Sequence, residues 1–137
     1  MVIAASHDIS SPRDSVSGLA TGKRKHQPFV ITKEVDKSSP LLYNILVNNE
    51  NITEWELQFW SPGSNSRTGF GIEKQCYTVK LTNANISDIS FRMPNNKNPE
   101  LVRYAEYEEI SFTYEKISWS WVDGGIMAED DWSVTNP

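Results

Sequence analysis

The sequence predicts a mainly β protein, a small barrel of antiparallel strands with one short α-helix. Residues Thr53–Trp60 alternate between apolar and polar side chains, which is typical of a half-buried strand. Ser39–Val47 instead carries apolar residues at helical spacing. In Glu106–Trp121 the alternation changes phase once, which indicates a strand that bends at the corner of a barrel or sandwich. A chain of 137 residues lies within the single-domain range, so we predict one domain over residues 1–137.

The predicted strands are apolar or alternating runs that turn-forming residues separate. Loops are predicted where glycine, proline and asparagine accumulate, at Ser61–Gly71 and Pro94–Glu100, with a tight turn at Asn83. We expect the loop at Ser61–Gly71 to join the two strands of a long hairpin. In chain order, the strands are expected at Val2–Ile9, Phe29–Thr32, Thr53–Trp60, Ile72–Leu81, Ala84–Met93 and Glu106–Trp121.

The predicted helix begins at a serine that proline follows. Ser38 or Ser39 can cap it, and Pro40 would take the first internal position, where a missing N–H costs nothing. Lys37 and Asn44 are expected to stay exposed. The apolar residues that recur at helical spacing are Leu41, Leu42, Ile45 and Leu46, and of these we expect Leu42, Ile45 and Leu46 to be buried against the sheet.

The last long strand carries two sets of apolar residues that cannot share one face if the strand is flat. The first set falls on even positions and the second on odd positions. Because a shift of one residue reverses every side chain, we predict a β-bulge near Glu115-Lys116 that bends the strand. The two sets are Ile110, Phe112 and Tyr114, and then Ile117, Trp119 and Trp121.

Two long motifs give the chain a resemblance to a known family. Gly22–Tyr43 contains G-K-R-x-H-x-P-F-x-x-T-K-x-x-D-x-S-S-P-x-L-Y, and Glu108–Trp119 resembles E-x-V-x-F-x-Y-x-K-I-x-W. Asp123-Gly124-Gly125 and Asp130-Asp131-Trp132 match a D-G turn and a D-W tail. The chain thus resembles the Hcp family, the tube proteins of the bacterial type VI secretion system. The family-motif residues are Pro28, Phe29, Asp36, Pro40, Leu42, Tyr43, Phe112, Tyr114, Ile117 and Trp119.

This resemblance implies a structural and carrier role. Family members form hexameric rings that stack into an inner tube, which is expelled with effectors. The implied partners are further copies of the chain, the spike protein, the sheath and small effector proteins, and no cofactor is implied. Ser10–His26 is rich in glycine and charge and should be an exposed loop. The resemblance implies that this loop reaches the next ring, with Pro12, Gly18, Gly22, Lys23, Arg24 and His26 as its stacking residues.

The chain differs from the Hcp pattern at its N-terminus. Relatives begin with an additional strand region before the strand at Val2–Ile9, so the chain is expected to be N-terminally truncated. A sheet that lacks a strand exposes an unpaired edge, which weakens subunit contacts. We therefore expect this chain to be mainly monomeric or irregularly oligomeric at micromolar concentration.

The bulk composition argues against several other classes of protein. A net charge of −5 and a pI near 5.0 disfavour general nucleic-acid binding, whose footprint is basic. No apolar stretch reaches the roughly 18 residues that span a bilayer, and Met1–Ser10 lacks a signal-peptide pattern. The chain is therefore expected to fold in the cytosol, without membrane insertion. The resemblance implies that it is then secreted from the bacterial cytoplasm by the type VI system, without a cleaved signal peptide.

No catalytic, metal or cofactor site is predicted. His7 and His26, with Asp8 or Asp36, lack the spacing of metal ligands, and Cys76 has no adjacent base and no disulfide partner in this sequence. Adjacent acids in a strand point to opposite faces and cannot act on one bond. Such acids, at Glu108-Glu109 and Asp130-Asp131, are expected to be solvated or to lie at subunit contacts.

The tryptophans leave one alternative function open, a monomeric carbohydrate-binding β-domain. Trp60 is out of phase with the inward residues of its strand, and Trp132 lies in a polar tail, so both are candidates for exposed stacking platforms. In the tube interpretation, Trp55, Trp119 and Trp121 belong to the core.

Overall fold

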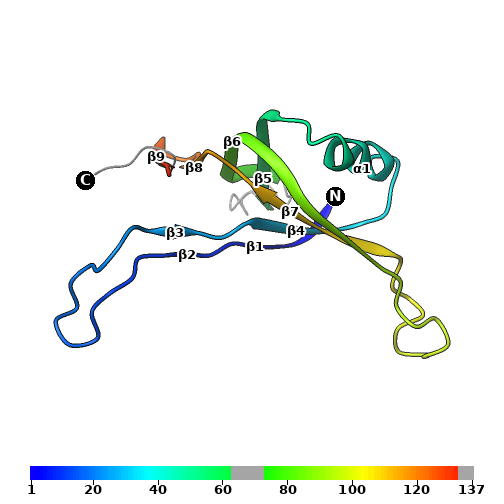
Figure 1. Ribbon diagram of the computed structural model, residues 1–137. Coiled ribbons are helices and arrows are strands. Elements are labelled where there is room, and N and C mark those ends of the chain that lie inside the picture. The colour runs from blue at the N-terminus through cyan, green and yellow to red at the C-terminus, as the bar shows by residue number, and fades with distance from the viewer. Residues whose placement is uncertain (63–72, 133–137) are drawn as a thin grey trace. The chain divides into compact units, whose positions relative to one another are not determined.

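Residues 1–62 and 73–132 are described by the computed structural model, and strands dominate them (Figure 1). The helix is α1 (Ser39–Val47). All strand pairs in the described residues are antiparallel, which confirms the predicted mainly β class with one short helix. The strands are β1 (Val2–Ser6), β2 (Ile9–Ser10), β3 (Lys25–His26), β4 (Phe29–Glu34), β5 (Ile52–Pro62), β6 (Glu73–Arg92), β7 (Tyr107–Thr113), β8 (Lys116–Trp121) and β9 (Ile126–Asp131).

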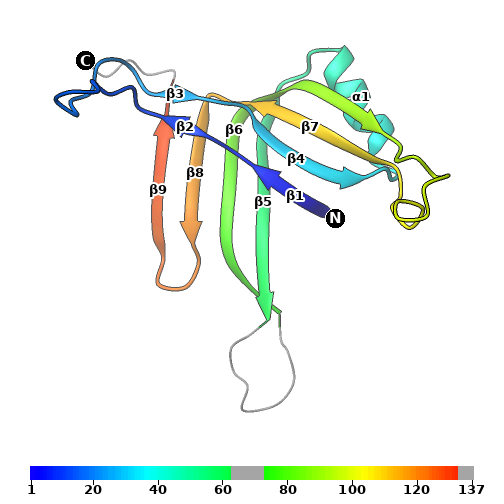
Figure 2. The same ribbon diagram turned by 90° about the horizontal axis from the view of Figure 1, so that it is seen from below.

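The chain divides into two compact units. Unit 1 contains residues 1–51 and 85–113, and its main sheet has the order β1, β4, β7 and the second part of β6. Unit 2 contains residues 52–84 and the described part of 114–137. In unit 2, β5, the first part of β6, β8 and β9 lie side by side (Figure 2). The long strand β6 therefore contributes to both units.

The core of unit 1 lies on one face of its sheet. Burial alternates along β4 and β7, so every second side chain points to the same side. Phe29 pairs with Phe112 and Ile31 with Ile110, and Ile86 of β6 also pairs with Phe112. All five side chains are buried. The core of unit 2 is built in the same way by Val79, Leu81, Ala84, Tyr114 and Ile117.

Helix α1 is less buried than its sequence suggests. It begins at Ser39 with Pro40 in its first turn, as predicted, but Ser38 at the N-cap position makes no side-chain capping hydrogen bond. Leu42, Ile45 and Leu46 are only half-buried. Leu41 belongs to the apolar set but not to the three residues expected to be buried, and its side chain is 65% exposed. Since successive helical residues are about 100° apart, Leu41 lies beyond the narrow stripe that reaches the sheet.

The end of α1 is defined by an asparagine in the left-handed region. Asn49 has φ 51°, a conformation that asparagine tolerates better than most residues. The Glu50 N–H donates to the Ile45 carbonyl, and the Asn49 N–H donates to the Leu46 carbonyl. This pair of bonds is a Schellman motif, which satisfies carbonyls that the last helical turn leaves open.

Asn83 does not make the predicted turn. The two strands expected at Ile72–Leu81 and Ala84–Met93 are one continuous strand, β6, in which Asn83 has φ 50°. Its side-chain amide donates a 2.8 Å hydrogen bond to Glu115 Oε2. The buried residues of β6 have odd numbers before Asn83, at Val79 and Leu81, and even numbers after it, at Ala84 and Ile86. A single left-handed residue thus reverses the face of the strand without ending it.

The predicted bulge at Glu115-Lys116 is also absent. Thr113 pairs with Asn85 and Lys116 pairs with Thr82, so the two strands keep the same register across this point. The phase change is real, but it is accommodated by the break between β7 and β8 opposite Asn83. Between β6 and β7, the register shifts instead in β6, between Ile86 and Asp88.

Several other strand predictions are corrected by small amounts. The run Val2–Ile9 divides into β1 and the start of β2. Trp121 was expected in the core, yet it is 48% exposed. Pro94–Glu100 is an exposed loop, as predicted. The long hairpin between β5 and β6 forms, but its predicted loop Ser61–Gly71 begins inside β5 and then lies outside the described residues.

Candidate assembly site

The predicted stacking loop is a hairpin that projects from unit 1 (Figure 1). Its base is the ribbon of β2 and β3, in which Ile9 pairs with His26 and Ser10 with Lys25. An isolated bridge between Arg13 and Ala20 continues the pairing. Most side chains between residues 10 and 26 are exposed, which agrees with the expectation of an exposed segment. Backbone pairing makes this segment a ribbon rather than an irregular loop.

The tip of the hairpin is organised by Asp14. Its carboxylate accepts the Val16 N–H at 2.8 Å, and its backbone carbonyl accepts the Gly18 N–H at 2.9 Å. The hydrogen bond from Val16 holds the pKa of the Asp14 carboxyl below its ordinary value. Gly18 has φ 73°, a conformation that favours glycine. This turn leaves two aliphatic side chains in solvent, with Val16 94% and Leu19 69% exposed.

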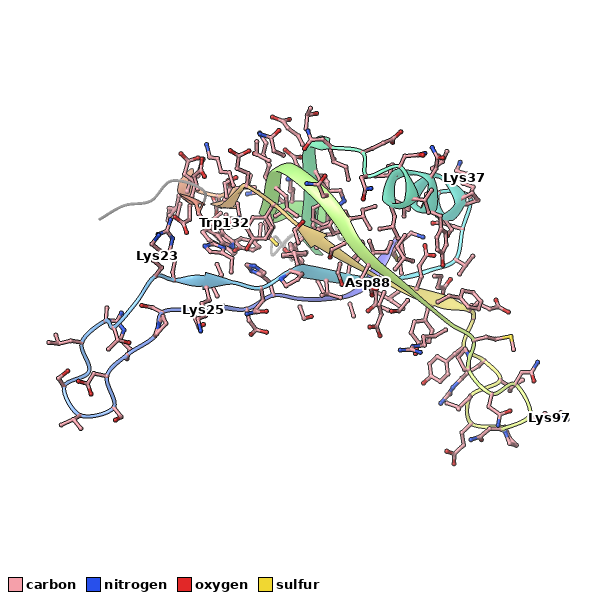
Figure 3. All side chains as sticks on the ribbon, in the orientation of Figure 1. Lys23, Lys25, Lys37, Asp88, Lys97 and Trp132 are labelled. Atoms are coloured by element: carbon pink, nitrogen blue, oxygen red, sulfur yellow. The ribbon has the colours of Figure 1, made fainter. Side chains whose placement is uncertain are left out.

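The predicted stacking residues occupy different parts of this hairpin. Gly18 forms the tip, Lys23 is exposed on the ribbon (Figure 3), and Arg24 and His26 are half-buried near its base. Pro12 is half-buried opposite Gly22, where an added Cβ would lie 3.9 Å from the proline Cγ. The structure therefore brings them into one element but not into one cluster. Sequence reasoning did not select Val16 and Leu19, although two aliphatic residues in a polar loop were a visible signal.

Strand β1 is the second surface open to another chain. Among the described residues β1 pairs with β4 alone, so its other edge has no strand beside it. Such an edge presents backbone N–H and C=O groups in the geometry of a sheet. The pairing is irregular between Val2 and Ala4, which limits how long a regular ladder this edge can offer.

A buried ionic cluster joins the start of α1 to the sheet. The Lys33 ammonium donates to Glu108 Oε1 at 2.7 Å and to Asp36 Oδ1 at 3.1 Å. The Ser39 hydroxyl donates to the same Glu108 oxygen at 2.8 Å and accepts the Asp36 N–H at 3.0 Å. Lys33 also donates to the carbonyl of Glu34. The family-motif residue Asp36 thus takes part in a contact that positions the helix.

The environment of this cluster changes two pKa values. Burial acts to lower the pKa of Lys33, but hydrogen bonds to Glu108 and Asp36 outweigh it and raise the pKa. Hydrogen bonds from the Ser38 hydroxyl and N–H, followed by the bond from Lys33, hold the pKa of Asp36 well below its ordinary range. Both groups are therefore charged at neutral pH. The arrangement is that of a structural ion pair, which fixes the start of α1 to the sheet.

The prediction that Glu108 is solvated or at a subunit contact is wrong, since its side chain is 1% exposed. Glu108 has the same strand phase as the core residues Ile110 and Phe112, so its position already indicated the inward face. Its second carboxylate oxygen, Oε2, has no hydrogen-bond partner among the described residues.

Comparison with known proteins identifies the family to which this chain belongs. A family model described as type VI secretion system effector, Hcp, matches residues 1–121. The chain belongs to the Hcp family. It is 38% identical over 132 residues to the major exported protein of Pseudomonas aeruginosa, which covers 96% of this chain and 74% of that protein.

Solved Hcp structures have the same fold. The crystal structure of one Hcp protein superposes with a TM-score of 0.85 at 32% identity, covering 96% of this chain and 76% of the other. The secreted protein Hcp3 from Pseudomonas aeruginosa has a TM-score of 0.74 at 32% identity, over 96% of this chain and 74% of the other. Hcp is a family of structural secreted proteins.

The Hcp motif residues divide between core and surface. Phe29, Phe112, Tyr114 and Ile117 are buried, and Pro28, Leu42 and Trp119 are half-buried. Pro40, Tyr43 and Asp36 are exposed on or beside α1. Burial, and then the nearby charge of Asp130, raise the pKa of the Tyr114 phenol. The Tyr114 carbonyl accepts a hydrogen bond from the Trp132 indole, which attaches the D-W motif to the core of unit 2.

The residues considered for metal binding or catalysis are engaged elsewhere. The His7 ring packs on Phe29, with centroids 5.3 Å apart, and burial followed by the charge of His26 lowers the pKa of His7. Cys76 Sγ lies 3.3 Å from the Phe59 carbonyl oxygen. In residues 1–62 and 73–132, no group of three or more His, Cys, Asp or Glu side chains could hold a metal ion. The helix in these residues is too short to cross a membrane.

Exposed aromatic residues also gather on unit 2. Trp60 and Trp132 are exposed, as expected. Phe59, Tyr77 and Trp121 form one row across β5, β6 and β8, in which Phe59 and Trp121 are exposed and Tyr77 is half-buried. The ring centroids of Phe59 and Tyr77 are 5.7 Å apart.

Proposed function

We propose that this Hcp chain is a subunit of the type VI inner tube. Six copies form a ring, rings stack, and the tube leaves the bacterial cytoplasm without a cleaved signal peptide. The tube carries small effector proteins and works with the spike protein and the sheath. The observation that carries the proposal is an exposed hairpin between residues 9 and 26, paired at its base, in a chain of the Hcp family.

The other surfaces support this proposal in separate ways. The open edge of β1 is suited to contacts within a ring, because a second chain can pair with its backbone. The hairpin is suited to contacts between rings. Its conformation and its surface charge depend on the predicted stacking residues Pro12, Gly18, Gly22, Lys23, Arg24 and His26. The buried motif residues, Phe29, Phe112, Tyr114 and Ile117, stabilise the subunit fold. The function needs no catalytic, metal or cofactor site.

Native mass spectrometry and electron microscopy test the proposal together. At micromolar concentration the chain is still expected to be mainly monomeric or irregularly oligomeric. At higher concentration, where contacts along the edge of β1 can form, it should give hexamers that stack into tubes. Deletion of Asp14–Ala20 should abolish stacking but leave the hexamer and the melting temperature almost unchanged, because the deleted residues are exposed. A chain that stays monomeric at every concentration, and that fails to support tube formation in a strain lacking its own Hcp, would contradict the proposal.

A second candidate function is carbohydrate binding by a monomer. The row of Phe59, Tyr77 and Trp121 favours it, since aligned rings can stack on sugars. Titration with oligosaccharides, followed by tryptophan fluorescence, separates the two functions. Saturable binding that Trp121→Ala removes would support the carbohydrate function, and the tube function expects no such affinity.

A further inference from the structure

Unit 1 contains an open pocket of about 480 Å³ at one end of its sheet. Thr32 and Glu34 line it, and they alternate along β4 with the core residues Ile31 and Lys33. The pocket therefore lies on the face of the sheet opposite the core. Its remaining wall is mostly apolar and comes from β1 and from the segment that joins β6 to β7. This wall includes Ile3, Met93, Leu101 and Tyr104.

The rim of this pocket carries one acid and one base. Glu34 pairs with Tyr107, and Tyr107 pairs with Arg92, so the three residues form a row across β4, β7 and β6. Glu34 and Arg92 are both exposed. An apolar hollow with a few charged groups at its edge is the usual composition of a binding site. Its occupant should offer aliphatic groups beside one cation and one anion.

The hairpin tip offers this combination. Val16 and Leu19 project their aliphatic side chains into solvent, and Arg13 and Asp14 precede them. The hydrogen bonds of Asp14 already order the turn, so little conformational freedom remains to be lost on binding. The tip is thus complementary to the pocket in both polarity and charge.

The tip cannot fill the pocket of its own chain. Within unit 1, the hairpin and the segment between β6 and β7 project from opposite ends of the sheet in both views (Figures 1 and 2). Figure 3 marks the hairpin by Lys25 and the opposite end by Lys97. A contact between tip and pocket must therefore join two copies.

We propose that the hairpin tip of one copy inserts Val16 and Leu19 into the pocket of a second copy, where Arg13 meets Glu34 and Asp14 meets Arg92. The contact is heterologous, because it joins two different surfaces and leaves one tip and one pocket open for further copies. The inference rests on the proposed tube function, in which it identifies the acceptor for the hairpin of the adjacent ring.

Two variants and their matched controls test each half of the contact. Val16→Asp with Leu19→Asp disables the tip, and Ser11→Asp with Thr21→Asp adds the same charge at exposed sites outside the aliphatic pair. Ala105→Trp blocks the pocket, and Val102→Trp adds the same bulk in the same segment outside the pocket wall. Electron microscopy and mass photometry should show that stacking falls about tenfold or more in both disabled variants and not in the controls.

Mixing the two disabled variants gives the decisive result. Rings of the Val16→Asp, Leu19→Asp variant have disabled tips but open pockets. Rings of the Ala105→Trp variant have blocked pockets but intact tips. An equal mixture should therefore form stacks of two rings and nothing longer. Disabled variants that stack like the controls, or a mixture without paired rings, would overturn the inference while leaving the ring itself intact.

The experiment also separates this inference from the proposed function. If the parent chain forms no rings at any concentration, the tube function fails, and the same mixture is then analysed for one-to-one pairs of single chains. Such pairs support the contact between tip and pocket, and their absence overturns it.

Discussion

At the scale of single residues, a buried charge pair and two asparagines decide features that apolar patterning does not. Lys33 and Glu108 bring opposite charges into the interior of unit 1, where each is stabilised by the other and by Ser39. Asn49 and Asn83 take left-handed conformations, one to end α1 and the other to reverse β6. The alternation of apolar residues in β7 indicated that Glu108 points inward. That Lys33 is its partner could not be predicted, because it depends on the pairing of β4 with β7.

Replacing the cation of the buried pair should be costly. Lys33→Met leaves the Glu108 carboxylate buried without its counter-charge, so the free energy of unfolding should fall by about 3–5 kcal/mol. Chemical denaturation at neutral pH measures this loss. Lys37→Met is the matched control, since Lys37 is exposed (Figure 3) and its replacement should change stability by less than about 0.5 kcal/mol.

A double variant checks the physical reason. Lys33→Met with Glu108→Leu removes both charges and should recover most of the lost stability, because an apolar pair needs no compensation. A double variant that is as unstable as Lys33→Met alone would show that the cluster acts by shape and not by charge.

The pH dependence of stability should reveal the two perturbed groups of this cluster. Asp36 has a folded pKa below its unfolded value of 3.8, so its contribution is present above pH 3.8 and is lost as the pH falls further. Lys33 has a folded pKa above its unfolded value of 10.5, so its contribution is present below pH 10.5 and is lost at higher pH. Denaturation of the parent chain and Asp36→Asn should therefore give curves that converge in acid. A constant difference between them down to strongly acidic pH would exclude a role for the Asp36 charge.

At the scale of elements, helix α1 shows where pattern reasoning succeeds and where it stops. Proline and the aliphatic spacing predicted its position correctly, because both are local signals, although the expected serine cap does not form. The width of its buried face depends on how closely the helix approaches the sheet, which no local pattern contains. The same distinction explains β6, where Asn83 has the composition of a turn but tertiary pairing on both sides maintains the strand.

Truncation of the helix residues should reflect this partial burial. Leu42→Ala should cost roughly 1–2 kcal/mol, below the 2–5 kcal/mol typical of a fully buried leucine, because Leu42 is half-buried. Leu41→Ala is the matched control on the exposed side and should change stability by less than about 0.5 kcal/mol. Denaturant titration of both variants compares them, and equal losses would contradict the assigned face of α1.

At the scale of the whole molecule, the mainly β class and the family were both accessible from the sequence. Motifs such as Asp36–Tyr43 are contiguous, so they remain visible without knowledge of the fold. The pocket beside Arg92 was not accessible, since it combines residues from β1, β4 and the segment between β6 and β7. Sites of this kind exist only after strand pairing has brought distant segments together.

The prediction of one domain over residues 1–137 can be tested by cooperativity. Because β6 runs through both units, we expect them to unfold in a single transition. Calorimetry should then give equal calorimetric and van't Hoff enthalpies. Two resolved transitions, or tryptophan fluorescence and circular dichroism curves that do not coincide, would show that the units fold separately.

The separation of the hairpin tip from the pocket also gives any resulting assembly a direction. One terminus of such a filament displays only tips and the other displays only pockets, so the two termini are chemically different. Growth can then proceed at unequal rates at the two termini, and a capping factor with a tip-like loop would arrest only one of them. A secretion machine that uses such a filament could therefore start it at one terminus and leave the other free to elongate.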